Sequence, residues 1–245
     1  MPRSSTDVLR IPALEAETGL LHGFSTLAMG SMRLPVPGGE PLTPARVAFA
    51  AALGLDGARL TVAGAVHGAE VARVDGPAGA VKGHDALVTD RPDVPLLATF
   101  ADCYPVVVHD PVRRSLALVH AGWRGTAAGI AARAVEALFR EYGSQPADLV
   151  AGLGPGICGC CYEVGEEVAE RFDPAFVRPS PAGRRLLDLA AANRAQLEAA
   201  GVRAERVHDH GVCTRESGVL PSHRRSPDGT RFACIASLRK TTCSP

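Results

Sequence analysis

The amino-acid sequence predicts an α/β fold: a single-domain layered sandwich in which central mixed β-sheets are flanked by helices. Short apolar segments rich in β-branched residues alternate with helical patterns along the chain. Neither a repeat period nor a low-complexity tract interrupts this alternation. No linker-like stretch divides the chain into independent halves, so we expect one domain over residues 1–245, with its core at about 20–237.

The first half of the chain predicts one helix followed by strands. In the helix at residues 43–54, Thr43 suits the N-cap, Pro44 the first helical position and Gly54 the left-handed exit. The strands are apolar and rich in β-branched residues. They cover residues 59–76 (one or two strands), 85–90, 94–100, 104–110 and 115–121. Because the connections between the last three strands are too short for a helical crossover, the sheet is antiparallel or mixed here.

From Thr126 onward the hydrophobic period becomes helical. Ile130, Ala134, Leu138 and Phe139 line one face of a helix that ends near Gly143. The remaining elements follow in chain order: a strand at 148–156, helices at 164–172 and 187–201, and closing strands at 202–214 and 230–238.

Composition narrows the classes of partner. With 26 basic and 26 acidic residues the formal net charge is zero, so we expect no nucleic acid and no membrane as partner, and small molecules instead. The N-terminus has no signal-peptide pattern and no segment approaches the roughly 18 apolar residues of a spanning helix, which predicts a cytoplasmic protein. Seven cysteines, an odd number, predict reduced thiols.

Cys103 and His120 stand near opposite ends of one predicted hairpin. If the turn lies at residues 110–114, the two residues face each other with Cβ atoms about 4.5–5.5 Å apart. Three interpretations are open: two core residues, a nucleophile with its general base, or two metal ligands. Both residues lie at strand ends, where functional sites are built, and this favours chemistry over packing.

His67, in "AVHGAEV", completes a His, Cys, His set with Cys103 and His120. Three protein ligands with one open position are typical of catalytic zinc, which lowers the pKa of a bound water toward neutrality. A Cys–His hydrolase or amidase, with Cys103 as nucleophile and His120 as base, is the alternative. A non-catalytic binding protein is a third class. Eight scattered histidines disfavour a multicopper oxidase.

A second group of residues is typical of substrate contacts. Arg124, Gly125 and Thr126 open a predicted helix, where backbone N–H groups and a guanidinium bind anions such as phosphate. Arg224, in "SHRR", is another candidate for anion binding, and Tyr162 is a candidate for lining the site.

The segment "CGCCYEVG" gathers Cys158, Cys160 and Cys161. Their spacing differs from that of a zinc knuckle, and no second cysteine pair lies at a suitable distance. We therefore expect close packing around a glycine-rich turn.

Several motifs occur in a recognisable order: "VHG", "DALVTD", "ADCYPVVVHDP", "VHAGWRGTAAGI", "GPGICGCCYEVGEEV" and "SHRR". In this order the sequence resembles the laccase-domain family, once called multicopper polyphenol oxidases. Its members are described as zinc-dependent purine nucleoside phosphorylases that also deaminate adenosine, and one bacterial branch is called a peptidoglycan editing factor. The alternative amidase would therefore act on a peptidoglycan precursor.

The resemblance implies an α/β sandwich and a zinc site on His67, Cys103 and His120, with copper less favoured. It implies a purine nucleoside (adenosine, inosine or methylthioadenosine) and phosphate as partners. Three positions depart from the family pattern, namely Leu27, Ala65 and His223. We expect these departures to affect substrate preference more than metal binding.

Overall fold

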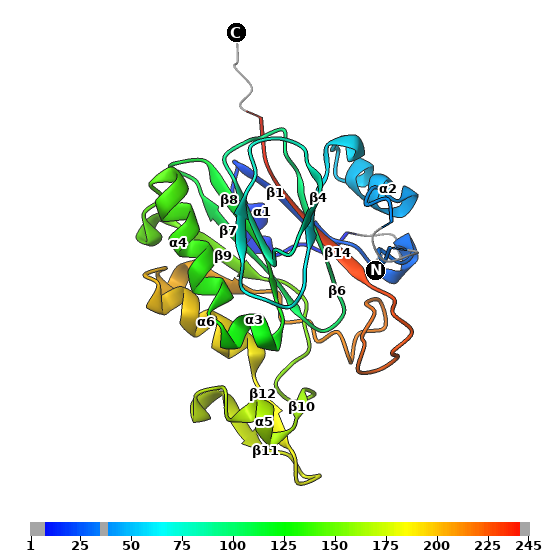
Figure 1. Cartoon of the computed structure of the whole chain (residues 1–245), viewed down its shortest axis with the longest axis vertical. Helices are drawn as coiled ribbons and strands as arrows, with labels where there is room; N and C mark the ends of the chain where they lie inside the picture. The colour runs from blue at the N-terminus through cyan, green and yellow to red at the C-terminus, as the bar shows by residue number, and fades with distance from the viewer. Residues whose placement is uncertain (1–7, 35–38, 241–245) are drawn as a thin grey trace.

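The computed structural model describes residues 8–34 and 39–240, and it confirms the α/β class. Two large sheets lie together in the described residues, a small third sheet stands apart, and helices flank the large sheets (Figure 1). The α-helices are α1 (Pro12–Glu15), α2 (Pro44–Ala52), α3 (Trp123–Ala127), α4 (Ile130–Tyr142), α5 (Glu166–Ala169) and α6 (Leu189–Ala199). Short 3₁₀ helices lie at Leu27–Met29, Gly57–Arg59, Pro146–Asp148, Pro174–Phe176 and Ala204–Arg206.

Each large sheet mixes parallel and antiparallel pairs, as expected. The five-stranded sheet has the order β1 (Leu20–Phe24), β14 (Phe232–Leu238), β6 (Leu96–Phe100), β2 (Thr61–Gly64), β4 (Gly79–Lys82). The six-stranded sheet has the order β13 (Val207–Asp209), β9 (Val150–Leu153), β7 (Tyr104–Asp110), β8 (Ser115–Ala121), β5 (Ala86–Thr89), β3 (Val71–Arg73).

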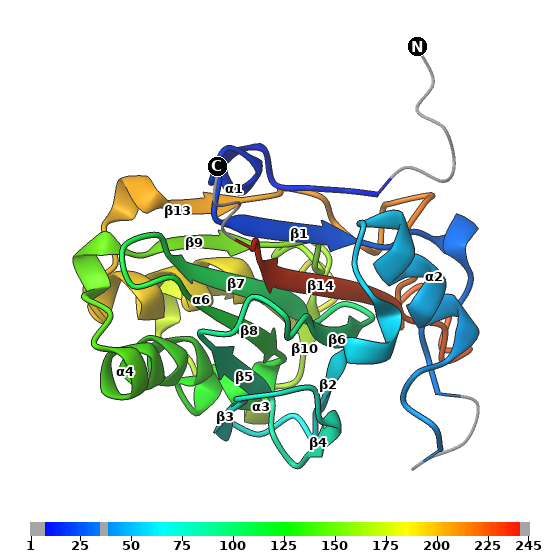
Figure 2. The same cartoon turned by 90° about the horizontal axis from the view of Figure 1, so that it is seen from above.

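The apolar core forms three layers, because successive side chains of a strand point to opposite faces of its sheet. In β7, Val107 packs in the layer between the two large sheets, whereas Val106 and Val108 pack in the layer beneath α4 and α6. A third layer, which includes Phe49 of α2 and Ile235 of β14, lies outside the five-stranded sheet. Figure 2 shows α2 and α4 on opposite sides of the stacked sheets.

A small lobe projects from this body. It contains α5 and an antiparallel sheet whose strand order is β10 (Glu163–Val164), β12 (Arg185–Leu187), β11 (Val177–Pro179), and it occupies the lower end of the molecule in Figure 1. The first strand of this lobe begins directly after Tyr162, so the lobe is joined to the segment that carries a predicted site residue.

Two expectations about helices were wrong. The helix expected from Thr126 is divided into α3 and α4, because Gly129 has a left-handed φ of 81° and interrupts the helical path. Thr43 precedes α2 but makes no capping hydrogen bond, and its buried hydroxyl has no hydrogen-bond partner among the described residues. Helix boundaries were therefore read correctly at Pro44 and Gly143 but not within residues 123–130.

The three successive strands at residues 94–121 do not share one sheet. β6 belongs to the five-stranded sheet, whereas β7 and β8 belong to the six-stranded sheet. Residues 101–103 carry the chain from one sheet to the other, and Asp102 has a φ of 84° within this crossing. The connection is short because the sheets are stacked rather than because the strands pair.

None of the described helices combines the length and the hydropathy that crossing a bilayer requires. Cys158 and Cys160 form a disulfide, so the expectation of reduced thiols was wrong for this pair. The other cysteines in the described part of the chain are free thiols: Cys103, Cys161, Cys213 and Cys234.

Candidate functional site

The candidate site lies at one end of the layer between the two large sheets. β8 brings His120 there, because Leu116 and Leu118 on the same face of the strand pack into that layer. Cys103 comes from the crossing after β6, and His67 comes from the segment between β2 and β3. Three segments that are separate in the sequence thus converge.

The β7–β8 hairpin has a different register from the expected one. Pro105 lies opposite His120, and Cys103 precedes the first residue of β7. The two side chains therefore approach each other diagonally at the end of the hairpin rather than from directly opposed positions. The expected proximity of Cys103 and His120 is present, but through a different geometry.

His67, Cys103 and His120 each offer one ligand atom, and these atoms lie within 4.8 Å of one another. The imidazole rings of the two histidines have centroids 5.0 Å apart and stand at 82° to each other. His120 is buried, whereas His67 and Cys103 are partly exposed. The three residues form a compact cluster with one open side.

The backbone near the cluster is held in an uncommon conformation. His67 has a φ of 62° and Asp102, next to Cys103, has a φ of 84°. Left-handed conformations of non-glycine residues cost on the order of 1–3 kcal/mol and occur preferentially at functional sites. Here they set the direction from which two of the three side chains enter the cluster.

Asp85 organises the cluster from behind. Its buried carboxylate accepts hydrogen bonds from the backbone N–H groups of Val66 (3.1 Å), His67 (2.8 Å) and Gly68 (2.8 Å). It also lies 3.0 Å from Nδ1 of His120, which leaves Nε2 of that ring as the available ligand atom. The sequence analysis did not assign Asp85 a role, although a carboxylate directly before the apolar strand segment at residues 86–88 is a signal that could have identified it.

The electrostatics of the cluster favour a thiolate beside an imidazolium. Burial raises the pKa of Cys103, but the charges and hydrogen bonds of His120 and His67 outweigh it and lower that pKa to about 6. Burial lowers the pKa of His120, but the neighbouring Cys103 charge and the Asp85 hydrogen bond raise it to about 9. For Asp85, burial raises the pKa, and the hydrogen bonds from His120 and the backbone lower it further than burial raises it.

This donor set fits zinc. Zinc in proteins takes imidazole nitrogen and thiolate sulfur, and a ligating histidine commonly donates its other N–H to a carboxylate. Cys103 is in the form that ligation requires, Nε2 of His120 becomes a donor once a cation displaces its proton, and the pair of His120 and Asp85 supplies the carboxylate contact. With three protein donors, a fourth position stays open toward solvent or substrate.

Asp102 links the cluster to a distant loop. Its side chain accepts a hydrogen bond from the hydroxyl of Thr214 (2.6 Å) and another from the backbone N–H of Arg224 (2.8 Å). Its carbonyl oxygen accepts from the backbone N–H of Ile157 (2.9 Å). Asp102 therefore connects the residue before Cys103 to the segments that carry Ile157, Thr214 and Arg224. The sequence analysis did not single it out.

A cavity of about 370 Å³ opens beside the cluster, within the size range of small-molecule sites. Its lining includes five of the residues predicted from the sequence: His67, Cys103, Arg124, Tyr162 and Arg224. The other lining residues are Ala101, Asp102, Trp123, Ile157, Leu189, His223, Gly229, Thr230 and Arg231.

The cavity offers cations beside aromatic rings. The guanidinium of Arg124 lies over the Trp123 ring at 4.3 Å from its centroid, and that of Arg224 lies over the Tyr162 ring at 4.8 Å. Arg231 is a third cation, and Asp102 is the one acidic side chain among the described lining residues. Such a cavity suits a ligand that combines a flat ring with an anionic or strongly polar group.

Gly125 and Thr126 do not line this cavity. A Cβ on Gly125 would lie 2.6 Å from the carbonyl oxygen of Gly68, so this glycine allows α3 to pack against the segment that carries His67. The hydroxyl of Thr126 is buried and hydrogen-bonded to Asn193 of α6. Both residues hold α3 in place in the structure.

The three departures from the family pattern lie in different surroundings. His223 lines the cavity beside the cluster. Ala65 and Arg33 line a separate cavity of about 390 Å³, whose lining also includes His67 and His120. Leu27 is exposed.

Gly122 provides the space that the cluster occupies. A Cβ at this position would lie 3.0 Å from Sγ of Cys103 and 3.2 Å from Cδ2 of His67. We expect Gly122→Ala to displace one of these ligands, lowering zinc affinity and costing about 1–3 kcal/mol of folding stability. Competition with a chromophoric chelator measures the affinity, and thermal denaturation measures the stability.

Gly76→Ala is the matched control, because no atom lies within 4 Å of the added Cβ and the φ of Gly76 is outside the left-handed region. It should retain the zinc affinity of the parent protein. Equal zinc affinities of Gly122→Ala and the parent protein would show that metal binding does not depend on the absence of a side chain at Gly122.

Comparison with known families identifies a match over residues 40–238 to the model described as multi-copper polyphenol oxidoreductase laccase. A purine nucleoside phosphorylase of Deinococcus radiodurans is 40% identical, over 94% of this chain and 92% of the relative. A purine nucleoside phosphorylase of Streptomyces coelicolor is 42% identical, over 78% of this chain and 80% of the relative. Adenosine deaminase RL5, from an unknown prokaryotic organism, is 37% identical over 70% of this chain and 71% of the relative.

Among solved structures, YlmD from Geobacillus stearothermophilus superposes with a TM-score of 0.87 and 30% identity, covering 97% of this chain and 98% of YlmD. The hypothetical protein YfiH of Bacillus licheniformis gives a TM-score of 0.82 and 31% identity, covering 90% of this chain and 93% of YfiH. The similarity therefore extends over both large sheets.

Proposed function

Because the chain belongs to the multi-copper polyphenol oxidoreductase laccase family, we propose that it is a zinc-dependent purine nucleoside phosphorylase that also deaminates adenosine. One observation carries the proposal: the His67, Cys103, His120 cluster stands at the wall of an arginine-lined cavity of small-molecule size. The names of the relatives, purine nucleoside phosphorylase and adenosine deaminase, support the same substrate class.

In this proposal, His67, Cys103 and His120 hold the zinc ion. When bound, zinc supplies a Lewis acid that polarises an oxygen at its open position. Asp85 keeps His120 in the tautomer that presents Nε2, and it also fixes the backbone of His67. One histidine cluster does not provide the several coupled copper sites of a multicopper oxidase, so we propose zinc rather than copper.

The cavity side chains bind and orient the substrate. The rings of Trp123 and Tyr162 provide flat apolar surfaces for a purine. Arg124, Arg224 and Arg231 provide donors for phosphate and for ribose hydroxyls. In phosphorolysis a phosphate oxygen forms a bond to the anomeric carbon while the glycosidic bond to the purine breaks, and the base leaves with a proton.

Arg224 is held ready for such a contact. Its backbone N–H donates to Asp102, and its Nη1 donates to the carbonyl oxygen of Glu163 (2.7 Å). Arg224 lines the cavity, and its guanidinium lies over the Tyr162 ring. Preorganised donors lose less conformational freedom when the ligand binds.

The test of the proposed function is a chromatographic product assay with adenosine. Purified protein is incubated with and without phosphate, before and after removal of metal with a chelator. We expect adenine with phosphate, inosine without it, and neither product after chelation until zinc is restored. Activity that resists chelation, together with its loss on alkylation of Cys103, would instead support a cysteine nucleophile.

Arg124 separates the two reactions, because only phosphorolysis uses phosphate. We expect Arg124→Ala to raise the KM for phosphate about 10- to 100-fold, since a hydrogen bond to a charged group contributes about 1.5–3 kcal/mol. Deamination of adenosine without phosphate should change much less. Steady-state kinetics of both reactions on one preparation give the comparison.

Arg133→Ala is the matched control, because this exposed arginine of α4 pairs with Glu70 and is not among the residues that line the cavity. Its KM for phosphate should equal that of the parent protein. An Arg124→Ala variant with an unchanged KM for phosphate would remove Arg124 from the proposed phosphate site.

A further inference from the structure

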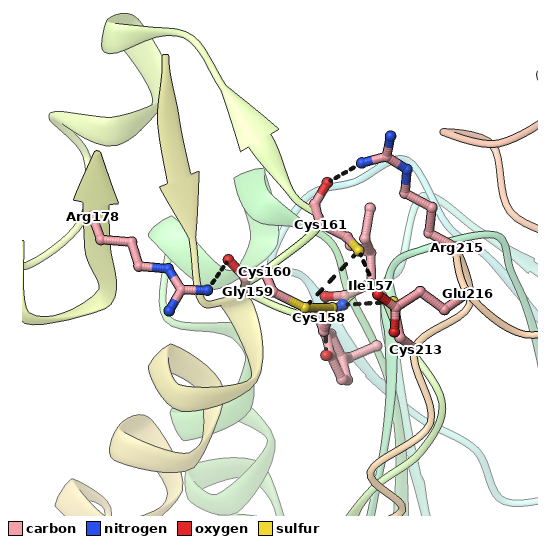
Figure 3. Close-up of a disulfide and its surroundings, with 10 residues drawn as sticks. Ile157, Cys158, Gly159, Cys160, Cys161, Arg178, Cys213, Arg215 and Glu216 are labelled. Atoms are coloured by element: carbon pink, nitrogen blue, oxygen red, sulfur yellow. Dashed lines mark hydrogen bonds between the residues drawn. A yellow bond between two sulfur atoms is a disulfide. The ribbon is translucent and has the colours of Figure 1, made fainter. Parts of the chain in front are cut away.

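A second cluster of sulfur ligands lies outside the catalytic cluster. Cys158, Cys160 and Cys161 meet Glu216 from a segment more than fifty residues away, and their ligand atoms lie within 4.8 Å of one another. Cys213 lies beside them and accepts a hydrogen bond from the backbone N–H of Cys158 (3.3 Å). Figure 3 shows these side chains converging from two loops. The proposed phosphorolysis and deamination use none of them.

Two of the spacings within this cluster match tetrahedral zinc. With Zn–S bonds of about 2.3 Å and Zn–O bonds of about 2.1 Å, tetrahedral geometry places two sulfurs about 3.8 Å apart and a sulfur and an oxygen about 3.6 Å apart. Sγ of Cys160 and Sγ of Cys161 are 3.9 Å apart, and Sγ of Cys161 is 3.4 Å from Oε1 of Glu216. Two edges of the tetrahedron are therefore already formed.

The surroundings support ligands rather than close packing. Cys160 and Glu216 are exposed, and Cys158 and Cys161 are partly exposed, so an ion from solvent can reach them. Nη1 of Arg215 donates to the carbonyl oxygen of Cys161 (3.0 Å), and Nη2 of Arg178 donates to that of Gly159 (3.1 Å). These contacts anchor the loop from both sides (Figure 3).

The oxidation state of Cys158 and Cys160 decides whether this cluster can bind a metal ion. Cys158 and Cys160 are joined in a disulfide, and a sulfur in a disulfide is not a thiolate ligand. Breaking the bond requires two electrons and two protons, which a thiol reductant supplies: two reductant thiols become one disulfide, and Cys158 and Cys160 become thiols. A cation that binds then displaces the thiol protons into solvent.

We propose that Cys158, Cys160, Cys161 and Glu216 form a second metal site, which binds Zn²⁺ when the thiols are reduced and is closed by the Cys158–Cys160 disulfide. The site is independent of the His67, Cys103, His120 cluster and of the reaction that takes place there. Zn²⁺ is the cation with this preference for thiolates plus one carboxylate in tetrahedral geometry.

The test uses the full chain with Cys103→Ser, which removes the thiol of the catalytic cluster. After reduction with a phosphine and removal of metal, the protein is titrated with Co²⁺ under anaerobic conditions. We expect thiolate-to-cobalt charge-transfer absorption that saturates at about one equivalent and disappears when Zn²⁺ is added. The same protein with the disulfide intact should show no such absorption.

Two double variants locate the signal. Cys103→Ser with Cys160→Ser should lose the absorption, whereas Cys103→Ser with Cys234→Ser should retain it, because Cys234 is buried in β14. No absorption in reduced Cys103→Ser, or equal absorption in the two double variants or in the oxidised protein, would overturn the proposal.

The chain without any substitution provides a second measurement, which does not depend on how the variants fold. Native mass spectrometry should find one more zinc ion per chain in the reduced protein than in the oxidised protein. Equal zinc contents would overturn the second site. Failure of the adenosine assay would leave this difference unchanged, so the two proposals fail separately.

Discussion

Replacing Cys103 with alanine should abolish zinc binding at the His67, Cys103, His120 cluster, and with it the two proposed nucleoside activities. Cys103 is the one residue of the cluster that offers a sulfur atom, and as a thiolate it supplies negative charge that neutral imidazoles lack. Zinc content is best measured on the protein with the Cys158–Cys160 disulfide intact, because the proposed second metal site then binds no zinc. Activity is measured with adenosine, with and without phosphate.

Cys234→Ala is the control for this experiment, because it removes a free thiol that is buried in β14 instead of one at the cluster. It should retain bound zinc and both activities. Full activity in metal-free Cys103→Ala would eliminate the zinc mechanism, and a folded variant that keeps its zinc would eliminate Cys103 as a ligand. Circular dichroism establishes that the compared variants are folded.

Asp85→Asn should weaken both the cluster and the fold. The carboxylate oxygens accept three backbone N–H groups and face Nδ1 of His120, whereas an asparagine has one acceptor oxygen and turns an NH₂ group toward these donors. We expect zinc affinity and kcat/KM to fall about 10- to 100-fold, as for other partners of metal-ligating histidines. Folding stability should fall by about 1–3 kcal/mol, because buried donors lose their acceptor.

Asp75→Asn is the matched control, because Asp75 is an exposed carboxylate that pairs with Arg73 at the surface. Its effect on stability should stay within about 0.5 kcal/mol, with zinc affinity unchanged. Chelator competition and urea denaturation give the two quantities. An Asp85→Asn protein with the parent's zinc affinity would mean that Asp85 has no positioning role.

Local sequence patterns were sufficient to predict the fold class and part of the candidate site. The alternation of short apolar strands with amphipathic helices predicted the α/β class, and the hairpin of β7 and β8 predicted that Cys103 and His120 lie close together. These features depend on contacts close in sequence, where strand period and turn position set the geometry. The assignment of His67, Cys103 and His120 as zinc ligands stays a prediction.

The sheet pairing of β6 could not be predicted in this way. β6 and β7 are separated by three residues, and a short connection suggests a hairpin. The left-handed Asp102 instead directs the chain across the stack, and β6 pairs with β14 from the far end of the chain. Pairing between distant strands depends on which apolar faces are buried together, and local sequence does not specify this.

The sequence by itself determined the residue types for the chemistry: a cysteine and a histidine at the ends of one hairpin, a second histidine at position 67, an arginine next to Trp123, and a cysteine-rich turn. Only the tertiary structure decided what supports them. Pairing of β5 with β8 placed Asp85 beside His120, the approach of three separate segments left room at Gly122 for the cluster, and the folding of two distant loops brought Glu216 to Cys161. The reason is physical: these contacts join segments that local propensity does not link, so they exist only once the apolar layers have packed.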